Sequence, residues 1–306
     1  MSFSGKVKEE LTTLKSTTSE TLAVLSGFVR NNGFIKDDDL YLSTESDKVA
    51  EMLKKYIKYL YNIDVKIEKK DNLNLYKNKL NEIKIEEKTY FILNDLGVLD
   101  KNKRYIKKVP EYIVDGNEEI RSYLRGAFIS SGSINDPESS YHLEFTINKK
   151  EEAVFVQHLL NIFDLNAKIL ARDKGYMVYI KEAERISDFL KLIHANSAVM
   201  HYENVRVYHE EKNKTNRLNN CEQANTDKIV ASGMKELEDI KLIEDKITLD
   251  ALDGKLLVAA TYRKKYPEAS LKELSKIIEM EAGVKITKSG LNHRFRKIRE
   301  IASRLK

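Results

Sequence analysis

The polar and basic side chains near the C-terminus have the types and the spacing needed to contact DNA. Asn292 and Arg296 are four residues apart, so on a helix they lie on one face. An Asn side chain can pair with adenine through two hydrogen bonds, and an Arg side chain can do so with guanine. We therefore predict these two residues as base readers. The other predicted DNA contacts are Lys272, Lys288, Ser289, His293, Arg294, Lys297 and Arg299.

The periodicity of apolar residues predicts the helix that positions these side chains. Apolar residues recur with helical spacing on the opposite face, at Leu291, Phe295, Ile298, Ala302 and Leu305. A shorter helix is predicted to begin after Ser270, where Ser270 and Glu273 fit a capping box, and to end near Gly283.

Together these two helices predict a helix-turn-helix over about 270–302, within an all-α domain spanning 249–306. A further helix is expected over 249–266, before Pro267. The turn at 281–287 is longer than the usual three or four residues. An ordinary solvated basic helix face is the alternative interpretation.

The charge distribution separates this C-terminal segment from the rest of the chain. Residues 246–306 contain 15 Lys and Arg against 7 Asp and Glu, whereas residues 1–245 contain 38 basic and 41 acidic side chains. A basic segment attached to a nearly neutral body indicates that the segment is the part that meets a polyanion.

Residues 1–195 contain a degenerate internal repeat. The glycine pairs Gly27 and Gly33, and Gly126 and Gly132, fix its offset at 99 residues. Each copy follows the order helix, strand, helix, strand, strand, helix, which predicts a pseudo-twofold α+β domain. After the glycine-containing helices, the predicted strands are 40–44, 63–68, 82–86, 141–147, 167–172 and 176–180, and the predicted helices are 46–61, 88–96, 149–163 and 182–193.

Residues 196–248 are predicted as a polar, Asn-rich connector that leads into a helix over 229–243. Cys221 is predicted to be a small buried residue. No Cys and His spacing suggests a metal site, and no glycine-rich loop suggests a nucleotide, so no metal or cofactor is expected. The chain shows no signal peptide and no apolar run long enough to span a bilayer, so a cytoplasmic protein without membrane contact is expected.

The two glycine-containing helices resemble the LAGLIDADG motif of homing endonucleases. Leu25 to Gly33 and Leu124 to Gly132 each align with all nine positions of that motif. In that family, the carboxylate at the eighth position holds the catalytic metal ions. Here the eighth positions are Asn32 and Ser131, neither of which supplies the anionic oxygen that Mg²⁺ prefers. The resemblance therefore implies a LAGLIDADG-like fold that has no catalytic residues.

As a whole, the chain resembles the WhiA family of sporulation and cell-division regulators. The resemblance is carried by 3–11, by 124–128 and 133–144, by the Asn-rich 216–225 and by 289–294 in the predicted recognition helix. It implies a catalytically silent LAGLIDADG-like domain followed by a helix-turn-helix. It also implies transcriptional regulation connected with cell division and, in organisms that form spores, with sporulation.

The leading hypothesis is thus a sequence-specific DNA-binding regulator that is not an enzyme, associated with the nucleoid. Its expected partner is double-stranded DNA at promoters, with RNA polymerase or another regulator left open as a protein partner. One alternative is an active LAGLIDADG-type endonuclease. Another is a protein-interaction module, because the net negative charge of the first 245 residues disfavours DNA binding by the first domain. A local basic groove would instead allow that domain to bind DNA, and a solvated helix and strand edge is the favoured interpretation of its lysines: Lys54, Lys55, Lys58, Lys66, Lys69 and Lys70.

Overall fold

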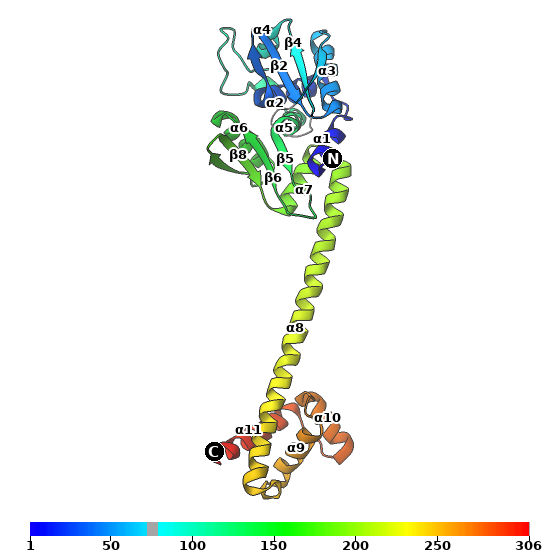
Figure 1. Cartoon of the computed structure of the whole chain (residues 1–306), viewed down its shortest axis with the longest axis vertical. Helices are drawn as coiled ribbons and strands as arrows, with labels where there is room; N and C mark the ends of the chain where they lie inside the picture. The colour runs from blue at the N-terminus through cyan, green and yellow to red at the C-terminus, as the bar shows by residue number, and fades with distance from the viewer. Residues whose placement is uncertain (72–78, 306) are drawn as a thin grey trace. The chain divides into compact units, whose positions relative to one another are not determined.

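The computed structural model describes residues 1–71 and 79–305. The chain forms two compact units, Met1–His209 and Glu210–Lys306, and the boundary between them falls inside one long helix, α8 (Asn196–Ile247) (Figure 1). The predicted Asn-rich connector, 196–248, is helical from Asn196 to Ile247. Cys221 is exposed on this helix, so the prediction that it is buried was wrong. The middle of α8 has no core around it, and its polar residues face solvent.

Within the described residues, the first unit contains two four-stranded antiparallel sheets with the same topology. Their strand orders are β1-β2-β4-β3 and β5-β6-β8-β7. This repetition confirms the predicted pseudo-twofold α+β fold. The elements are α1 (Phe3–Leu11), α2 (Thr18–Asn32), β1 (Phe34–Lys36), β2 (Asp39–Thr44), α3 (Asp47–Tyr61), β3 (Lys66–Asp71), β4 (Lys79–Ile85), α4 (Thr89–Asp95), α5 (Asn117–Ser131), β5 (Gly132–Ile134), β6 (Leu143–Ile147), α6 (Lys150–Ile162), β7 (Lys168–Arg172), β8 (Gly175–Ile180) and α7 (Ala183–Leu192), with a 3-10 turn at Glu111–Ile113.

Alternating apolar residues turn one face of each sheet toward the helices. In the first sheet, Leu40 pairs with Ile85 and Leu42 with Ile83, and all four side chains are buried. The residues between them on each strand point to the other face, as the two-residue period of a strand requires. The register is fixed by this pattern, because a shift of one residue would expose the apolar set.

The helices α2 and α5 pack directly against each other at their glycines. A Cβ atom on Gly27 would lie 2.3 Å from the carbonyl oxygen of Tyr123, and one on Gly126 would lie 2.0 Å from the carbonyl oxygen of Val24. Both distances are too short for any side chain, and the obstructing atoms are backbone. The glycines that define the repeat in the sequence are therefore the residues that let the two halves of the unit meet.

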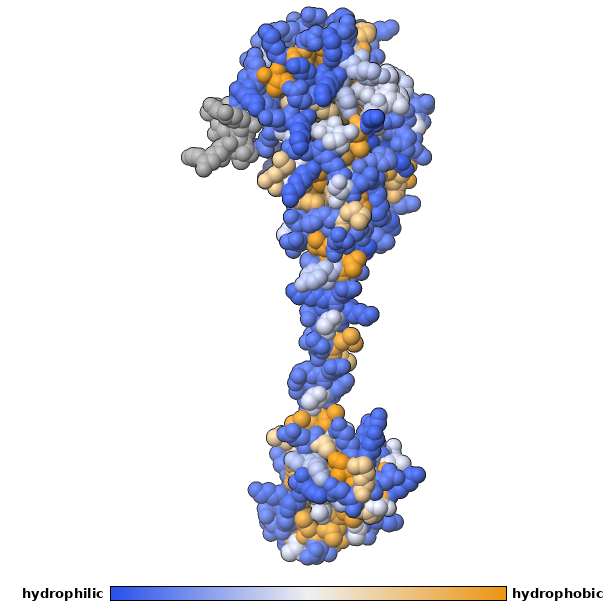
Figure 2. Space-filling model, turned by 90° about the vertical axis from the view of Figure 1, so that its right-hand side faces the viewer, coloured by the Kyte–Doolittle hydropathy of each residue, from blue (hydrophilic) through white to orange (hydrophobic). Residues whose placement is uncertain are grey.

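The second unit packs three helices against the end of α8. These are α9 (Gly254–Lys265), α10 (Leu271–Ala282) and α11 (Lys288–Arg304). The sequence predicted helix from residue 249, but a 3-10 turn occupies Leu249–Ala251 and α9 begins only at Gly254. Hydrophilic side chains predominate on the visible face of each unit (Figure 2).

Candidate nucleic-acid interface

The helix α11 is fixed by its cap and by its buried face. Its N-cap Thr287 accepts a hydrogen bond from the backbone N–H of Gly290 through Oγ1 at 3.1 Å. The apolar stripe predicted from the sequence packs inward, since Leu291, Phe295, Ile298 and Ala302 are all buried. The opposite face is consequently left to solvent along the full length of the helix.

The preceding helix α10 begins and ends as its sequence predicts. Ser270 Oγ accepts from the N–H of Glu273 at 3.2 Å, and the Glu273 carboxylate accepts from the N–H of Ser270 at 2.8 Å, which completes the capping box. Gly283 adopts the left-handed conformation (φ 66°) and ends the helix. Five residues separate α10 from α11, and one of them, Ile286, is buried against the core. The turn is thus longer than the usual one, but it is anchored.

A buried ion pair that the sequence analysis missed holds α11 against α8 and α9. Arg263 Nε donates to Glu236 Oε2 at 2.9 Å, and the two side chains are only 2% and 4% exposed. The Arg263 guanidinium also donates to the carbonyl of Ala269 at 2.6 Å and lies 5.4 Å from the centroid of the Phe295 ring. One side chain therefore links α8, α9, the turn before α10, and α11. The available signal was the helical spacing of Leu256, Ala260 and Arg263 on one face of α9.

Burial at this position would be unfavourable for the Glu236 carboxylate if it had no partner. Burial raises the pKa of Glu236, and the adjacent Arg263 opposes that shift by attracting the charged carboxylate. A buried carboxylate of this kind is tolerated because it has a partner and a hydrogen bond.

The predicted DNA-contacting residues gather on the solvent face of α11, apart from one on α10. Asn292 and Arg296 are both exposed, at successive turns of the helix. Arg294 is half-buried and donates to the carbonyl of Lys255 at 3.2 Å, which leaves it less free than its neighbours. The other exposed members of the predicted set are Lys272, Lys288, Ser289, His293, Lys297 and Arg299.

The basic side chains of this face differ in how far their charge is compensated. Arg299 lies 3.4 Å from Asp239 of α8, and Arg296 lies 3.9 Å from Glu300 and 3.4 Å from His293 Nδ1. Lys288 and Lys297, by contrast, form no ion pair with any acidic side chain of the described part of the chain. Their positive charges are available to phosphate groups, and Lys288 lies in the first turn, where the free N–H groups of the helix add to its field.

The two positions that correspond to catalytic acids lie in the first unit and are already engaged. Asn32 Oδ1 accepts from the backbone N–H of Ser43 at 2.8 Å, and Ser131 Oγ donates to the carbonyl of Ala127 at 3.0 Å. A neutral amide oxygen and a hydroxyl do not fit the oxygen-rich anionic site that a nuclease magnesium ion requires. Across residues 1–71 and 79–305, no cluster of three His, Cys, Asp or Glu side chains is placed to hold a metal ion.

Three of the six lysines proposed for a basic groove on the first unit are paired with acids. Lys58 lies 2.6 Å from Asp64, Lys69 lies 2.8 Å from Asp47, and Lys70 pairs with Glu82. Half of that predicted set is thereby neutralised locally, which weakens the case for a groove there.

Three domain families match successive parts of the chain. Residues 18–99 match the WhiA N-terminal LAGLIDADG-like domain, residues 120–212 the WhiA LAGLIDADG-like domain, and residues 215–302 the WhiA C-terminal HTH domain. Similar full-length relatives include proteins of Bacillus cytotoxicus and Bacillus cereus, each described as "Probable cell division protein WhiA". Each is 39% identical to this chain over 311 residues, covering 100% of the chain and 98% of the relative.

Solved structures share the fold. A full-length DUF199/WhiA from Thermatoga maritima superimposes with a TM-score of 0.59 at 23% identity, covering 99% of each chain. The N-terminal LAGLIDADG domain of DUF199/WhiA aligns with a TM-score of 0.52 at 26% identity, covering 62% of this chain and 89% of the other. In the described residues, no helix is both long enough and apolar enough to cross a membrane.

Proposed function

The chain belongs to the WhiA family, and we propose that it is a sequence-specific DNA-binding protein that regulates transcription in connection with cell division. In an organism that forms spores, the same regulation extends to sporulation. The protein acts in the cytoplasm on the nucleoid and does not cleave the DNA that it binds.

The observation that carries this proposal is the exposed face of α11. Asn292 and Arg296 present hydrogen-bonding groups suited to base edges, while Lys288 and Lys297 supply uncompensated charge for the phosphates. The helix behind this face is fixed by its cap and by the Arg263–Glu236 pair, so the side chains are presented by a rigid element. Such preorganisation is what a major-groove helix needs.

The absence of nuclease activity is supported by the chemistry of Asn32 and Ser131. The side chain of each forms a hydrogen bond with a backbone group, and neither carries a negative charge. A LAGLIDADG-like fold that has these two residues keeps the architecture of the nuclease without a site for its metal ions.

Binding of the full chain to a selected duplex and to a random duplex tests these assignments. Asn292→Ala and Arg296→Ala should each cost about 1–3 kcal/mol on the selected duplex and little on the random one. Lys297→Ala should weaken both duplexes to a similar extent and flatten the salt dependence. Equal losses on both duplexes for all three variants would refute the base-reading assignment.

A further inference from the structure

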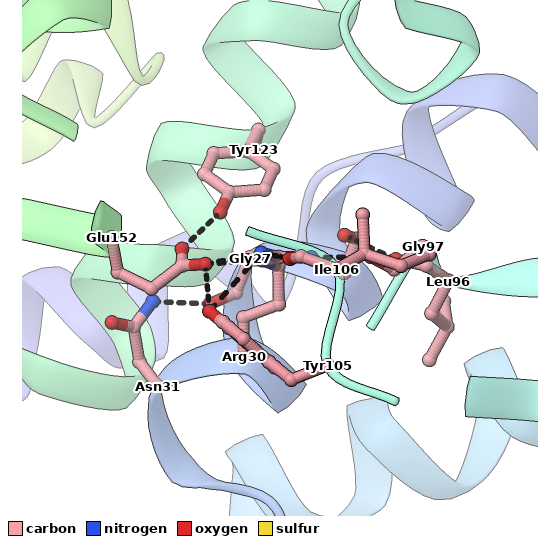
Figure 3. A network of polar contacts seen from close by, with 10 residues as sticks. Gly27, Arg30, Asn31, Leu96, Gly97, Tyr105, Ile106, Tyr123 and Glu152 are labelled. Atoms are coloured by element: carbon pink, nitrogen blue, oxygen red, sulfur yellow. Dashed lines mark hydrogen bonds and ion pairs between the residues drawn. The ribbon is translucent and has the colours of Figure 1, made fainter. Parts of the chain in front are cut away.

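A buried arginine in the first unit fixes a loop that has no role in the proposed DNA contact. Arg30 of α2 donates through Nη1 to the carbonyl of Gly97 and through Nη2 to the carbonyl of Ile106 at 2.6 Å (Figure 3). Its Nε donates to Glu152 Oε1 of α6 at 2.6 Å. The segment that follows α4 is therefore held at both ends by one guanidinium, which is itself paired with α6.

Two tyrosines complete this network around Glu152. The carboxylate accepts from Tyr123 at 3.0 Å and from the hydroxyl of Tyr105, which lies on the loop (Figure 3). The Tyr105 ring in turn lies under the ammonium of Lys149, 3.4 Å from the ring centroid. The loop and the N-terminal end of α6 thus form one fixed surface.

This surface is strongly basic within a nearly neutral part of the chain. Five of the eight residues from Lys101 to Lys108 are Lys or Arg, but the ammonium of Lys103 lies 3.5 Å from the centroid of the Tyr90 ring on α4. The basic residues at the α6 side of the loop are Lys107 and Lys108, each with one acidic neighbour, together with Lys149 and Lys150 at the start of α6. The side chains of Lys107 and Lys108 are 78% and 84% exposed. A fixed scaffold therefore presents these cationic side chains to solvent.

The same surface contains a hollow whose walls are mostly apolar. It has a volume of about 410 Å³ and is lined by three lysines, one glutamate and three further residues: Lys107, Lys108, Lys150, Glu151, Val154, Phe155 and His158. Val154 is 48% exposed and forms part of the apolar wall. Phe155 is half-buried and packs edge-on against Tyr123 at 5.4 Å. We call this feature the loop–α6 hollow.

We propose that the loop–α6 hollow binds an acidic segment of a partner protein, with an apolar side chain of that segment anchored on Val154 and Phe155. The lysines complement acidic groups around the anchor, and the apolar wall gains free energy when it is desolvated. A DNA backbone fits less well, because phosphates gain nothing from an apolar wall. Glu151 and Glu111 lie 3.8 and 3.6 Å from Lys107 and Lys108 and oppose any anionic partner, so the preference for a peptide over DNA rests on the apolar wall. This proposal is independent of the DNA-binding function.

Fluorescence anisotropy with the full chain tests the proposal. The probe is a labelled synthetic peptide that is rich in Asp and Glu around a central Phe and Leu. We expect saturable binding that weakens about tenfold or more when Lys108→Glu and Lys150→Glu are combined, since that is the effect of losing about 1.4 kcal/mol. The matched control combines Lys36→Glu with Lys55→Glu, two exposed lysines elsewhere on the unit, and should bind almost as well as the wild type.

Two further comparisons separate docking from simple charge attraction. Val154→Ser keeps the charge and should weaken peptide binding several-fold, as should replacing the Phe and Leu of the peptide by Ser. A thermal unfolding curve confirms that each variant is folded. Failure of the wild type to bind the peptide would overturn the proposal. So would equal losses in the two double variants, an unaffected Val154→Ser variant, or a duplex DNA that displaces the peptide from the hollow.

Discussion

Under the proposed function, some side chains of the second unit contact DNA and others hold helix α11 in place. Arg296 and Lys297 are neighbours on the exposed face of α11, whereas Arg263 is buried behind it. The buried arginine never needs to touch DNA to affect binding, because it determines where Phe295 and the rest of α11 lie. If replacing Arg263 lowers the affinity for DNA, we therefore expect the cause to be a change in the position of α11.

Removing Arg263 should destabilise the protein far more than removing an exposed lysine beside it. Arg263→Met leaves Glu236 buried without its partner and should lower the free energy of unfolding by about 3–5 kcal/mol. Lys264→Met breaks the exposed pair with Glu244 and should cost about 0–1 kcal/mol. Denaturant unfolding of the two variants measures the difference. Similar costs for both would show that the buried pair is not a structural anchor.

The half-buried Lys8 of the first unit should make the stability of the folded protein depend on pH. Burial lowers the pKa of Lys8 to about 8, only partly opposed by the charge of Glu45, against 10.5 for an ordinary lysine. Between these two values the unfolded chain binds more protons than the folded chain, so this residue makes the protein more stable as the pH rises from about 8 to 10.5. At neutral pH its charge is a cost.

Lys8→Met should accordingly stabilise the protein at pH 7, by a free energy on the order of 2–3 kcal/mol. The advantage over the wild type should shrink as the pH rises from 8 toward 10.5. Chemical denaturation of both proteins across this range measures the difference. A constant difference, or a wild type that is more stable at pH 7, would contradict the assigned burial of the charge.

At the scale of helices, α2 and α5 are the two repeated glycine-containing helices, and they pack directly against each other at their glycines. Gly27→Ala and Gly126→Ala each place a methyl group against a backbone carbonyl that cannot move aside. We expect each to lower the free energy of unfolding by about 3 kcal/mol or more, at or above the upper end of typical overpacking costs. Gly254→Ala is the matched control, because a Cβ there meets nothing within 4 Å and should be neutral or slightly stabilising. Thermal unfolding should give a much lower melting temperature for Gly27→Ala and Gly126→Ala than for Gly254→Ala. A small loss of stability in the first two variants would count against the close crossing of α2 and α5.

Elements with strong local signals were predictable from the sequence. The apolar stripe of α11, the capping box at Ser270 and the stop at Gly283 all appear as expected, because each is set by residues within one or two turns. The two sheets followed from alternating apolar residues. The strands β1 and β5 were missed because three residues are too few to show alternation.

What the sequence could not provide depends on partners that are distant along the chain. Arg263 was not identified from the sequence because its partner, Glu236, lies on another helix. The pairing of Arg299 with Asp239 has no local signal for the same reason. Cys221 was expected to be buried as a small apolar residue, but its helix has no core around it at that point. The assignment of base-reading residues stays a prediction.

At the scale of the whole chain, two units carry different surfaces. The basic second unit presents α11, and the nearly neutral first unit presents the lysines and the apolar wall of the loop–α6 hollow. Under the two proposals, α11 would contact DNA and the loop–α6 hollow would contact a protein partner. The two surfaces share no residues. Variants of α11 should therefore impair DNA binding alone, and variants of the loop–α6 hollow should impair peptide binding alone.

The most direct test of sequence-specific binding without cleavage uses the full chain, fragmented genomic DNA and Mg²⁺. Bound fragments are captured and sequenced together with their ends, in parallel with the Arg296→Ala variant. We predict that the wild type enriches intact fragments near promoters and that the variant loses this enrichment. Recurrent new ends inside the enriched sites would show that the protein cleaves DNA and would contradict the account. Unchanged enrichment by the Arg296→Ala variant would show that Arg296 of α11 does not determine sequence-specific binding.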